Sequence, residues 1–111
     1  DSTEQWRAAR YAMEALTGRV PYALVPGNHD YSGGAVRRSR LSDFFPVGEM
    51  EQVAGFVAPF EAGRLDSSAH RFEVNGERWL IVALEWGPRD DVLAWAGGVI
   101  DAHPDHRVIV R

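Results

Sequence analysis

Residues 20–30 read VPYALVPGNHD, an unbroken apolar run followed by a tight polar turn. A run without polar alternation is typical of a strand covered on both faces, as in a parallel sheet. Pro21 fits the start of such a strand, where a missing hydrogen-bond donor is tolerated. Pro26 and Gly27 end the run. The polar turn is therefore expected just beyond the carboxyl end of an inner strand, where ligand sites form in open α/β sheets.

The turn itself is Gly27-Asn28-His29-Asp30. Gly27 permits backbone conformations that other residues avoid. Asn28 offers a neutral amide oxygen, which suits a hard or borderline divalent cation. His29 can donate a proton near neutral pH, and Asp30 can accept from the other ring N–H and so fix the tautomer. These groups fit a metal-assisted phosphoryl-transfer site, although glycine, asparagine and aspartate also make ordinary turns.

A helix is predicted before the apolar run, over residues 3–17. Ser2 and Gln5 have the spacing of a capping box, and Gly18 is a natural residue to end the helix. Its apolar positions recur at helical spacing and form one buried face. They are Trp6, Ala9, Met13 and Leu16.

The second half of the chain predicts a hairpin, a helix and a strand. Asn75-Gly76 is a strong hairpin signal, and residues 79–84 form a buried strand after it. Residues 90–100 form a helix that Asp90 or Asp91 caps, with Val92, Trp95, Ala96, Val99 and Ile100 on one face. Another buried strand follows at 107–110. This order predicts a layered α/β architecture with a mixed sheet.

The connection over residues 31–69 has few regular signals. A short helix is expected within residues 36–45, anchored by Leu41, Phe44 and Phe45. A connection this long is more often the surround of an active site than idle chain. We expect its phenylalanines, Phe56 and Phe60 included, to pack the loop onto the body of the domain rather than to bind a ligand.

Composition limits the classes of protein. The chain has 111 residues, 45% of them hydrophobic and 25% charged, which are globular values that fit one domain or part of one. A net charge of −4 and a pI near 5.5 argue against a nucleic-acid-binding surface. There is no cysteine, and no apolar run long enough to span a membrane. Oligomeric state stays open.

The turn and its surroundings resemble the calcineurin-like metallophosphoesterase family, in which a Gly-Asn-His-Asp or Gly-Asn-His-Glu turn follows an inner strand. The helix that leads into residues 20–22 is similar to that family. So are residues 79–86, 93–95 and 103–110, WLIVALEW, LAW and HPDHRVIV. The likeness covers most of the chain and is weakest over residues 32–69.

The resemblance implies an α/β sandwich and a dimetal site. Asn28 corresponds to a metal ligand close to the substrate phosphate, and His29 to the group that assists the leaving group. Asp30 corresponds to the residue that positions that histidine. The cofactors would be two divalent cations, with iron, zinc or manganese all plausible from the family. The reaction would be hydrolysis of a phosphomonoester or a phosphodiester.

The sequence also departs from the family pattern. The family's earlier motifs, Asp-x-His and Gly-Asp-x-x-Asp, do not occur in residues 1–25, and its later Gly-His-x-His is absent. We therefore expect residues 1–111 to be the central part of a phosphoesterase domain, truncated at both ends and inactive in isolation. The alternative is a non-catalytic α/β structural or interaction segment with a degenerate site. Resemblance to exported bacterial phosphoesterases favours an extracytoplasmic location.

Other polar residues carry weaker hypotheses. His103 and His106 are expected in a solvated turn, because two histidines without further ligands make a poor metal site. His70 is expected at the surface or the sheet edge. Glu85 follows a buried strand and either faces a cleft or pairs with Arg89. Neither Ser67 nor Ser68 has a nearby base pattern that would make it a nucleophile.

Overall fold

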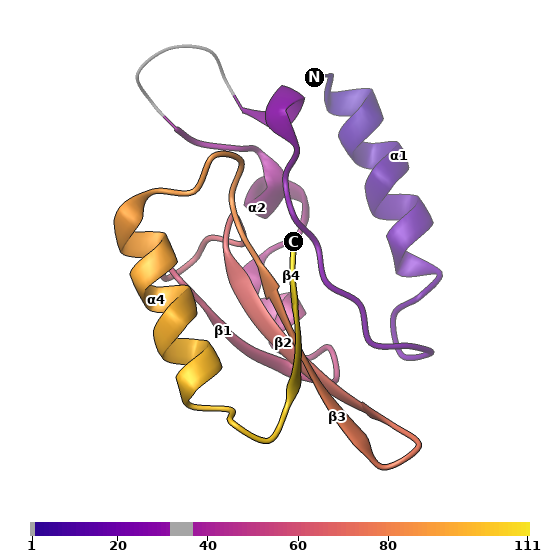
Figure 1. The fold of residues 1–111 in the computed structure, drawn as a ribbon. Coiled ribbons are helices and arrows are strands. Elements are labelled where there is room, and N and C mark those ends of the chain that lie inside the picture. The colour runs from indigo at the N-terminus through magenta and orange to yellow at the C-terminus, as the bar shows by residue number, and fades with distance from the viewer. Residues whose placement is uncertain (1, 32–36) are drawn as a thin grey trace.

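The computed structural model describes residues 2–31 and 37–111, and these ranges form one mixed sheet with helices on both faces (Figure 1). A four-stranded sheet has the order β1 (Phe56–Pro59), β2 (Ser68–Val74), β3 (Glu77–Ala83) and β4 (Arg107–Val110). β1 and β2 are antiparallel, as are β2 and β3, whereas β3 and β4 are parallel. The predicted α/β class with a mixed sheet is confirmed. The helical elements are α1 (Thr3–Glu14), a 3-10 turn η1 (Asn28–Asp30), α2 (Leu41–Phe44), α3 (Val47–Met50) and α4 (Asp90–Asp101).

Two apolar clusters hold the helices to the sheet. On one side α1, α2 and α3 share a core whose buried members are Trp6, Leu41, Phe45, Val47, Met50 and Leu65. On the other side Leu80 and Val82, both fully buried, pack against Ala96 of α4. Because alternate residues of a strand point to opposite faces, β3 contributes to both sides of the sheet.

The predicted hairpin is confirmed. Asn75 and Gly76 have φ values of 52° and 79°, the left-handed pair that a tight two-residue turn requires. The turn sets the register from Ser68 opposite Ala83 to Val74 opposite Glu77. The predicted face of α4 is also confirmed. Its N-cap, however, is Arg89 rather than Asp90 or Asp91, and the Arg89 side chain makes no capping hydrogen bond. The Asp91 Oδ1 accepts from the Val92 N–H in the first turn at 2.9 Å.

Helix α1 begins as predicted and ends early. The Oγ of Ser2 accepts from the Gln5 N–H at 3.2 Å, and the Gln5 Oε1 accepts from the Ser2 N–H at 2.9 Å, which completes the capping box. The helix stops at Glu14 with Ala15 as its C-cap, so the predicted end near residue 17 is wrong. A series of turns follows, and Gly18 at φ 75° lies within it.

Residues 20–25 do not form the predicted inner strand. They run extended without ladder hydrogen bonds in the described part of the chain. The side chains of Tyr22 and Leu24 pack against the core of α1, α2 and α3 instead. The Tyr22 hydroxyl also lies 3.2 Å from that of Thr17. The strand at 107–110 exists as β4, but its side chains are exposed rather than buried.

The long connection contains short elements that its apolar residues hold in place. The helix expected within residues 36–45 is the four-residue α2, and Val36 lies outside the described residues. The expected packing of the aromatics is confirmed. Phe45 is buried, the Phe44 ring stacks on Trp6 at 5.7 Å, and Phe60 meets Trp95 edge-on at 5.7 Å.

Gly55 allows β1 to approach β2. Its carbonyl accepts from the Arg71 N–H at 2.8 Å. A Cβ at this position would lie 2.0 Å from the Arg71 carbonyl oxygen, and φ is +90°. Only glycine fits here, because both the contact and the backbone conformation exclude a side chain.

His70 is buried, so its expected place at the surface or sheet edge is wrong. The residue is 5% exposed, and its ring meets the Phe56 ring edge-on at a centroid distance of 5.3 Å. Its Nε2 lies 2.9 Å from the Ser68 Oγ. Burial lowers the pKa of His70 from 6.5 to about 4. The folded protein therefore holds this imidazole neutral.

This burial predicts an acid-sensitive stability. His70 binds a proton near pH 6.5 in the unfolded chain but only near pH 4 in the folded protein. The stability gained from keeping this ring neutral is therefore complete above pH 6.5 and is lost as the pH falls from 6.5 to about 4. We expect the free energy of unfolding to fall by up to about 3 kcal/mol between these pH values. Urea unfolding at several pH values should show that the free energy of unfolding of His70→Gln depends less steeply on pH than that of the unsubstituted protein. Equal slopes would contradict the prediction.

Candidate functional site

The turn at residues 27–30 is a single 3-10 turn closed by its own carboxylate. The Asp30 N–H donates to the Gly27 carbonyl at 3.0 Å, and the Asp30 Oδ2 accepts from the Gly27 N–H at 2.7 Å. The structure thus gives Asp30 a backbone partner, and its predicted contact with the ring of His29 stays a prediction. Gly27 has φ −87°, so the expectation of an unusual glycine conformation is wrong.

His29 faces an open hollow beside α1. The hollow has a volume of about 560 Å³ and is lined by His29 and Asp30 on one side and by Gln5, Trp6 and Ala9 on the other. The side chains of Asn28 and His29 are exposed, and Asp30 is half-buried. The imidazole is therefore accessible to a ligand that enters between the turn and the helix.

The described residues do not supply a dimetal site. No group of three or more histidine, aspartate or glutamate side chains comes together within residues 2–31 and 37–111. Asn28 offers one neutral oxygen, and a divalent cation needs several ligands. The donors in this part of the chain therefore do not fit two cations by themselves.

A buried carboxylate lies beyond the carboxyl end of β3. The Glu85 side chain is 1% exposed, and Arg89 binds both of its oxygens, Nε to Oε1 at 2.8 Å and Nη2 to Oε2 at 3.2 Å. The backbone N–H of Arg89 also donates to Oε1, at 3.1 Å. Glu85 is the main cause of the raised pKa of Arg89. The predicted pairing with Arg89 is confirmed.

The ion pair continues into the long connection. Arg89 Nη2 binds the Glu61 carboxylate at 3.0 Å, and Arg64 Nη1 binds the other Glu61 oxygen at 3.1 Å. Arg64 in turn binds the buried Asp66 at 3.1 Å. Sequence reasoning missed Glu61, Arg64 and Asp66, because nothing in the sequence of the long connection indicates that Glu61 meets Arg89, 28 residues away.

Tyr31 links the polar turn to this network. Its hydroxyl accepts from the Trp86 N–H at 3.4 Å, and the Arg37 guanidinium lies 5.9 Å from the centre of its ring. Arg37 also donates to the Gly87 carbonyl at 2.9 Å. Burial, with help from Asp66, raises the pKa of Tyr31 to about 12, so the phenol stays neutral. The turn and Glu85 therefore lie at the same end of the sheet.

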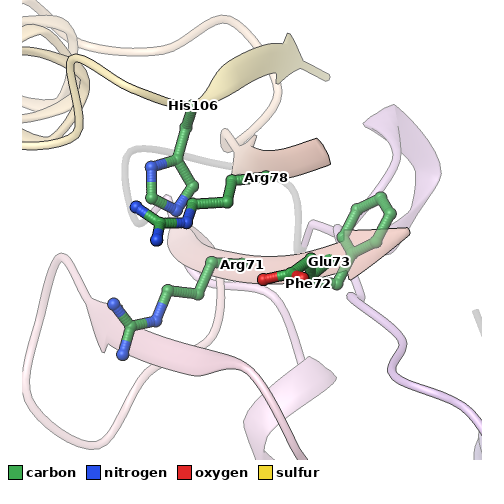
Figure 2. A pocket seen from close by; sticks show the side chains of 5 residues that line it. All are labelled: Arg71, Phe72, Glu73, Arg78 and His106. Atoms are coloured by element: carbon green, nitrogen blue, oxygen red, sulfur yellow. The ribbon is translucent and has the colours of Figure 1, made fainter. Parts of the chain in front are cut away.

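The remaining histidines lie elsewhere. His103 and His106 contact each other edge-on at 5.1 Å, and Asp105 binds the His106 Nδ1 at 2.9 Å. His106 lines a second hollow, of about 440 Å³, with Arg71, Phe72, Glu73 and Arg78 (Figure 2). This hollow is at the amino end of β3, so the structure does not bring these histidines to His29.

Comparison with known proteins gives one distant likeness. The chain is 25% identical over 109 residues to a protein of Bacillus subtilis (strain 168) described as "Uncharacterized protein YvnB". The match covers 96% of this chain and 8% of that protein, so the chain spans less than a tenth of its relative's length. No family model matches the chain, and no solved structure matches it. No helix among the described residues is long and apolar enough to cross a bilayer.

The network predicts an asymmetric response to substitution. Arg89→Met leaves the buried Glu85 carboxylate without its main partner and should lower the free energy of unfolding by about 2–3 kcal/mol. Arg107→Met is the matched control, since Arg107 pairs with Glu77 on the surface, and should cost under about 1 kcal/mol. Urea unfolding measures both losses. Equal losses would show that the buried pair is no more important than the exposed one.

Proposed function

We propose that this chain contributes the leaving-group side of a metallophosphoesterase active site within a longer protein. The reaction is the metal-dependent hydrolysis of a phosphomonoester or a phosphodiester. The observation that carries the proposal is the Gly27-Asn28-His29-Asp30 turn, whose His29 is accessible in a hollow beside α1. The adjoining Tyr31 contacts Trp86, beyond the carboxyl end of β3. Ligand sites of α/β proteins form at that end.

Three groups of the turn have separate roles in this proposal. His29 donates a proton to the leaving oxygen, and its exposed position makes the imidazole available for that transfer. Asp30 closes the turn by accepting a hydrogen bond from the Gly27 N–H, and so fixes the backbone position from which the His29 side chain extends. Asn28 offers an exposed amide oxygen as one metal ligand.

The cations require ligands from other polypeptide. A metal pair supplies charge neutralisation and a nucleophilic hydroxide in such sites, and the described residues lack the carboxylates and histidines to hold it. The match to less than a tenth of a long relative supports a role as one part of a larger protein. The same lack of ligands favours the second candidate, a non-catalytic structural segment with a degenerate site.

The first test uses the 111-residue chain alone. We expect elemental analysis to find no stoichiometric pair of divalent metals after incubation with iron, zinc or manganese, because residues 2–31 and 37–111 bring no cluster of three or more ligands together. We also expect no turnover of p-nitrophenyl phosphate above the metal-only background. Two bound metals with robust turnover would show that the site needs no further polypeptide.

The second test uses the full-length protein that carries this chain. His29→Ala should lower kcat about 10²- to 10⁴-fold for phenyl phosphate, whose leaving group needs a proton. The loss should be much smaller for p-nitrophenyl phosphate, whose leaving group does not. His103→Ala, far from the turn, is the control and should change neither. Equal losses on both substrates would remove the proton-donor role, and an inactive parent would favour the structural segment.

A further inference from the structure

The hollow on the α4 side of the sheet brings cationic side chains together. In the β2–β3 hairpin Glu73 lies opposite Arg78, and Arg71 lies opposite Leu80. Because alternate residues of a strand share a face, Arg71 and Arg78 lie on the face where Leu80 packs against α4. His106 directly precedes β4, which is parallel to β3, and lines the same hollow of about 440 Å³.

The fold holds these groups in place before any ligand arrives. The Arg71 N–H donates to the Gly55 carbonyl at 2.8 Å, and β3 lies along the other side of the residue. Asp105 binds Arg78 with one carboxylate oxygen and the His106 Nδ1 with the other, the latter at 2.9 Å. Figure 2 shows the guanidinium groups of Arg71 and Arg78 on the same side of the strands, with the His106 ring beside that of Arg78.

Two of these groups still have bonding capacity. Within residues 2–31 and 37–111 the Arg71 guanidinium has no ion pair and no hydrogen bond. The His106 side chain is only 8% exposed, and its Nδ1 is taken by Asp105. No buried side-chain nitrogen in the described ranges lacks a partner, so the unpaired Nε2 of His106 is reached by solvent from the hollow.

We propose that this hollow binds a phosphate ion between Arg71 and Arg78, with His106 as the third contact. Guanidinium groups bind phosphate through paired N–H donors. Donors that come from two strands and a loop suit a tetrahedral anion, which presents oxygens in more than two directions. A carboxylate has only two oxygens, and Arg78 already binds the carboxylate of Asp105.

Glu73 distinguishes this site from a generally basic surface. Its carboxylate lines the same hollow and makes no ion pair with Arg78, although the two residues lie opposite each other. A like charge at this place opposes an incoming anion. The proposal therefore requires that removal of the Glu73 charge strengthens phosphate binding, which a purely structural role of these residues does not.

The phosphate site is separate from the polar turn. The hollow lies at the amino end of β3, whereas Tyr31, next to the turn, contacts Trp86 beyond the carboxyl end of that strand. The inference therefore does not depend on phosphoester hydrolysis at His29.

An NMR titration of the whole 111-residue chain with inorganic phosphate tests the proposal, with ionic strength held constant by chloride. The side-chain signals of Arg71, Arg78 and His106 should shift saturably. Arg71→Gln should weaken binding at least about 10-fold, because a charge-assisted pair is lost. Glu73→Gln should tighten it about 3- to 10-fold, because a like charge is removed. Arg7→Gln removes the same charge from the exposed surface of α1 and, as the matched control, should leave the affinity unchanged.

Further arms of the titration identify the site and the anion. In His29→Ala the shifts at Arg71 and His106 should persist, and acetate should bind the unsubstituted chain more weakly than phosphate does. Backbone amide spectra report that each variant is folded. The proposal is overturned by the absence of saturable shifts at Arg71, by shifts that disappear with His29, or by weaker binding in Glu73→Gln. Equal weakening in Arg71→Gln and Arg7→Gln would also overturn it, since net charge alone would then explain the effect, and equal affinity for acetate would exclude a site built for a tetrahedral anion.

Discussion

The buried carboxylate of Glu85 is the constraint on which the candidate site depends. A charge this deep is tolerated only when it is paired and hydrogen-bonded, and Arg89 supplies both. Because Arg89 also binds Glu61, the start of α4, the end of β3 and the long connection are fixed to one another. Tyr31 extends this connection to the polar turn through Trp86. The long connection, whose apolar residues pack against α1, thus gains a second attachment through ion pairs.

The polar turn combines accessibility with a firm base. Its two internal hydrogen bonds are short-range, one in each direction between Gly27 and Asp30, so the shape of the turn is fixed locally. The side chains of Asn28 and His29 remain exposed to a ligand. Helix α1 supplies the opposite wall through Gln5, Trp6 and Ala9. A ligand at this site would bind between the polar turn and helix α1.

Two local signals predicted the structure correctly, whereas the end of α1 and the long-range pairings were not predicted. The capping box at Ser2 and the Asn75-Gly76 turn depend on residues at most three apart, and both are present. The strand at 20–25 was predicted from its apolar run, but such a run cannot say whether side chains pack on a sheet or on helices. His70 likewise lacks a local sign of burial, because the Phe56 ring covers it only after β1 and β2 have paired. Whether Asn28, His29 and Asp30 act on a phosphoester stays a prediction.

The close approach at Gly55 has a consequence for variation of this chain. Since the Arg71 carbonyl occupies the space of a side chain there, no natural substitution is compatible with the pairing of β1 and β2. A saturation library selected for folded protein should therefore return one amino acid at this codon. A single backbone contact thereby restricts position 55 to glycine.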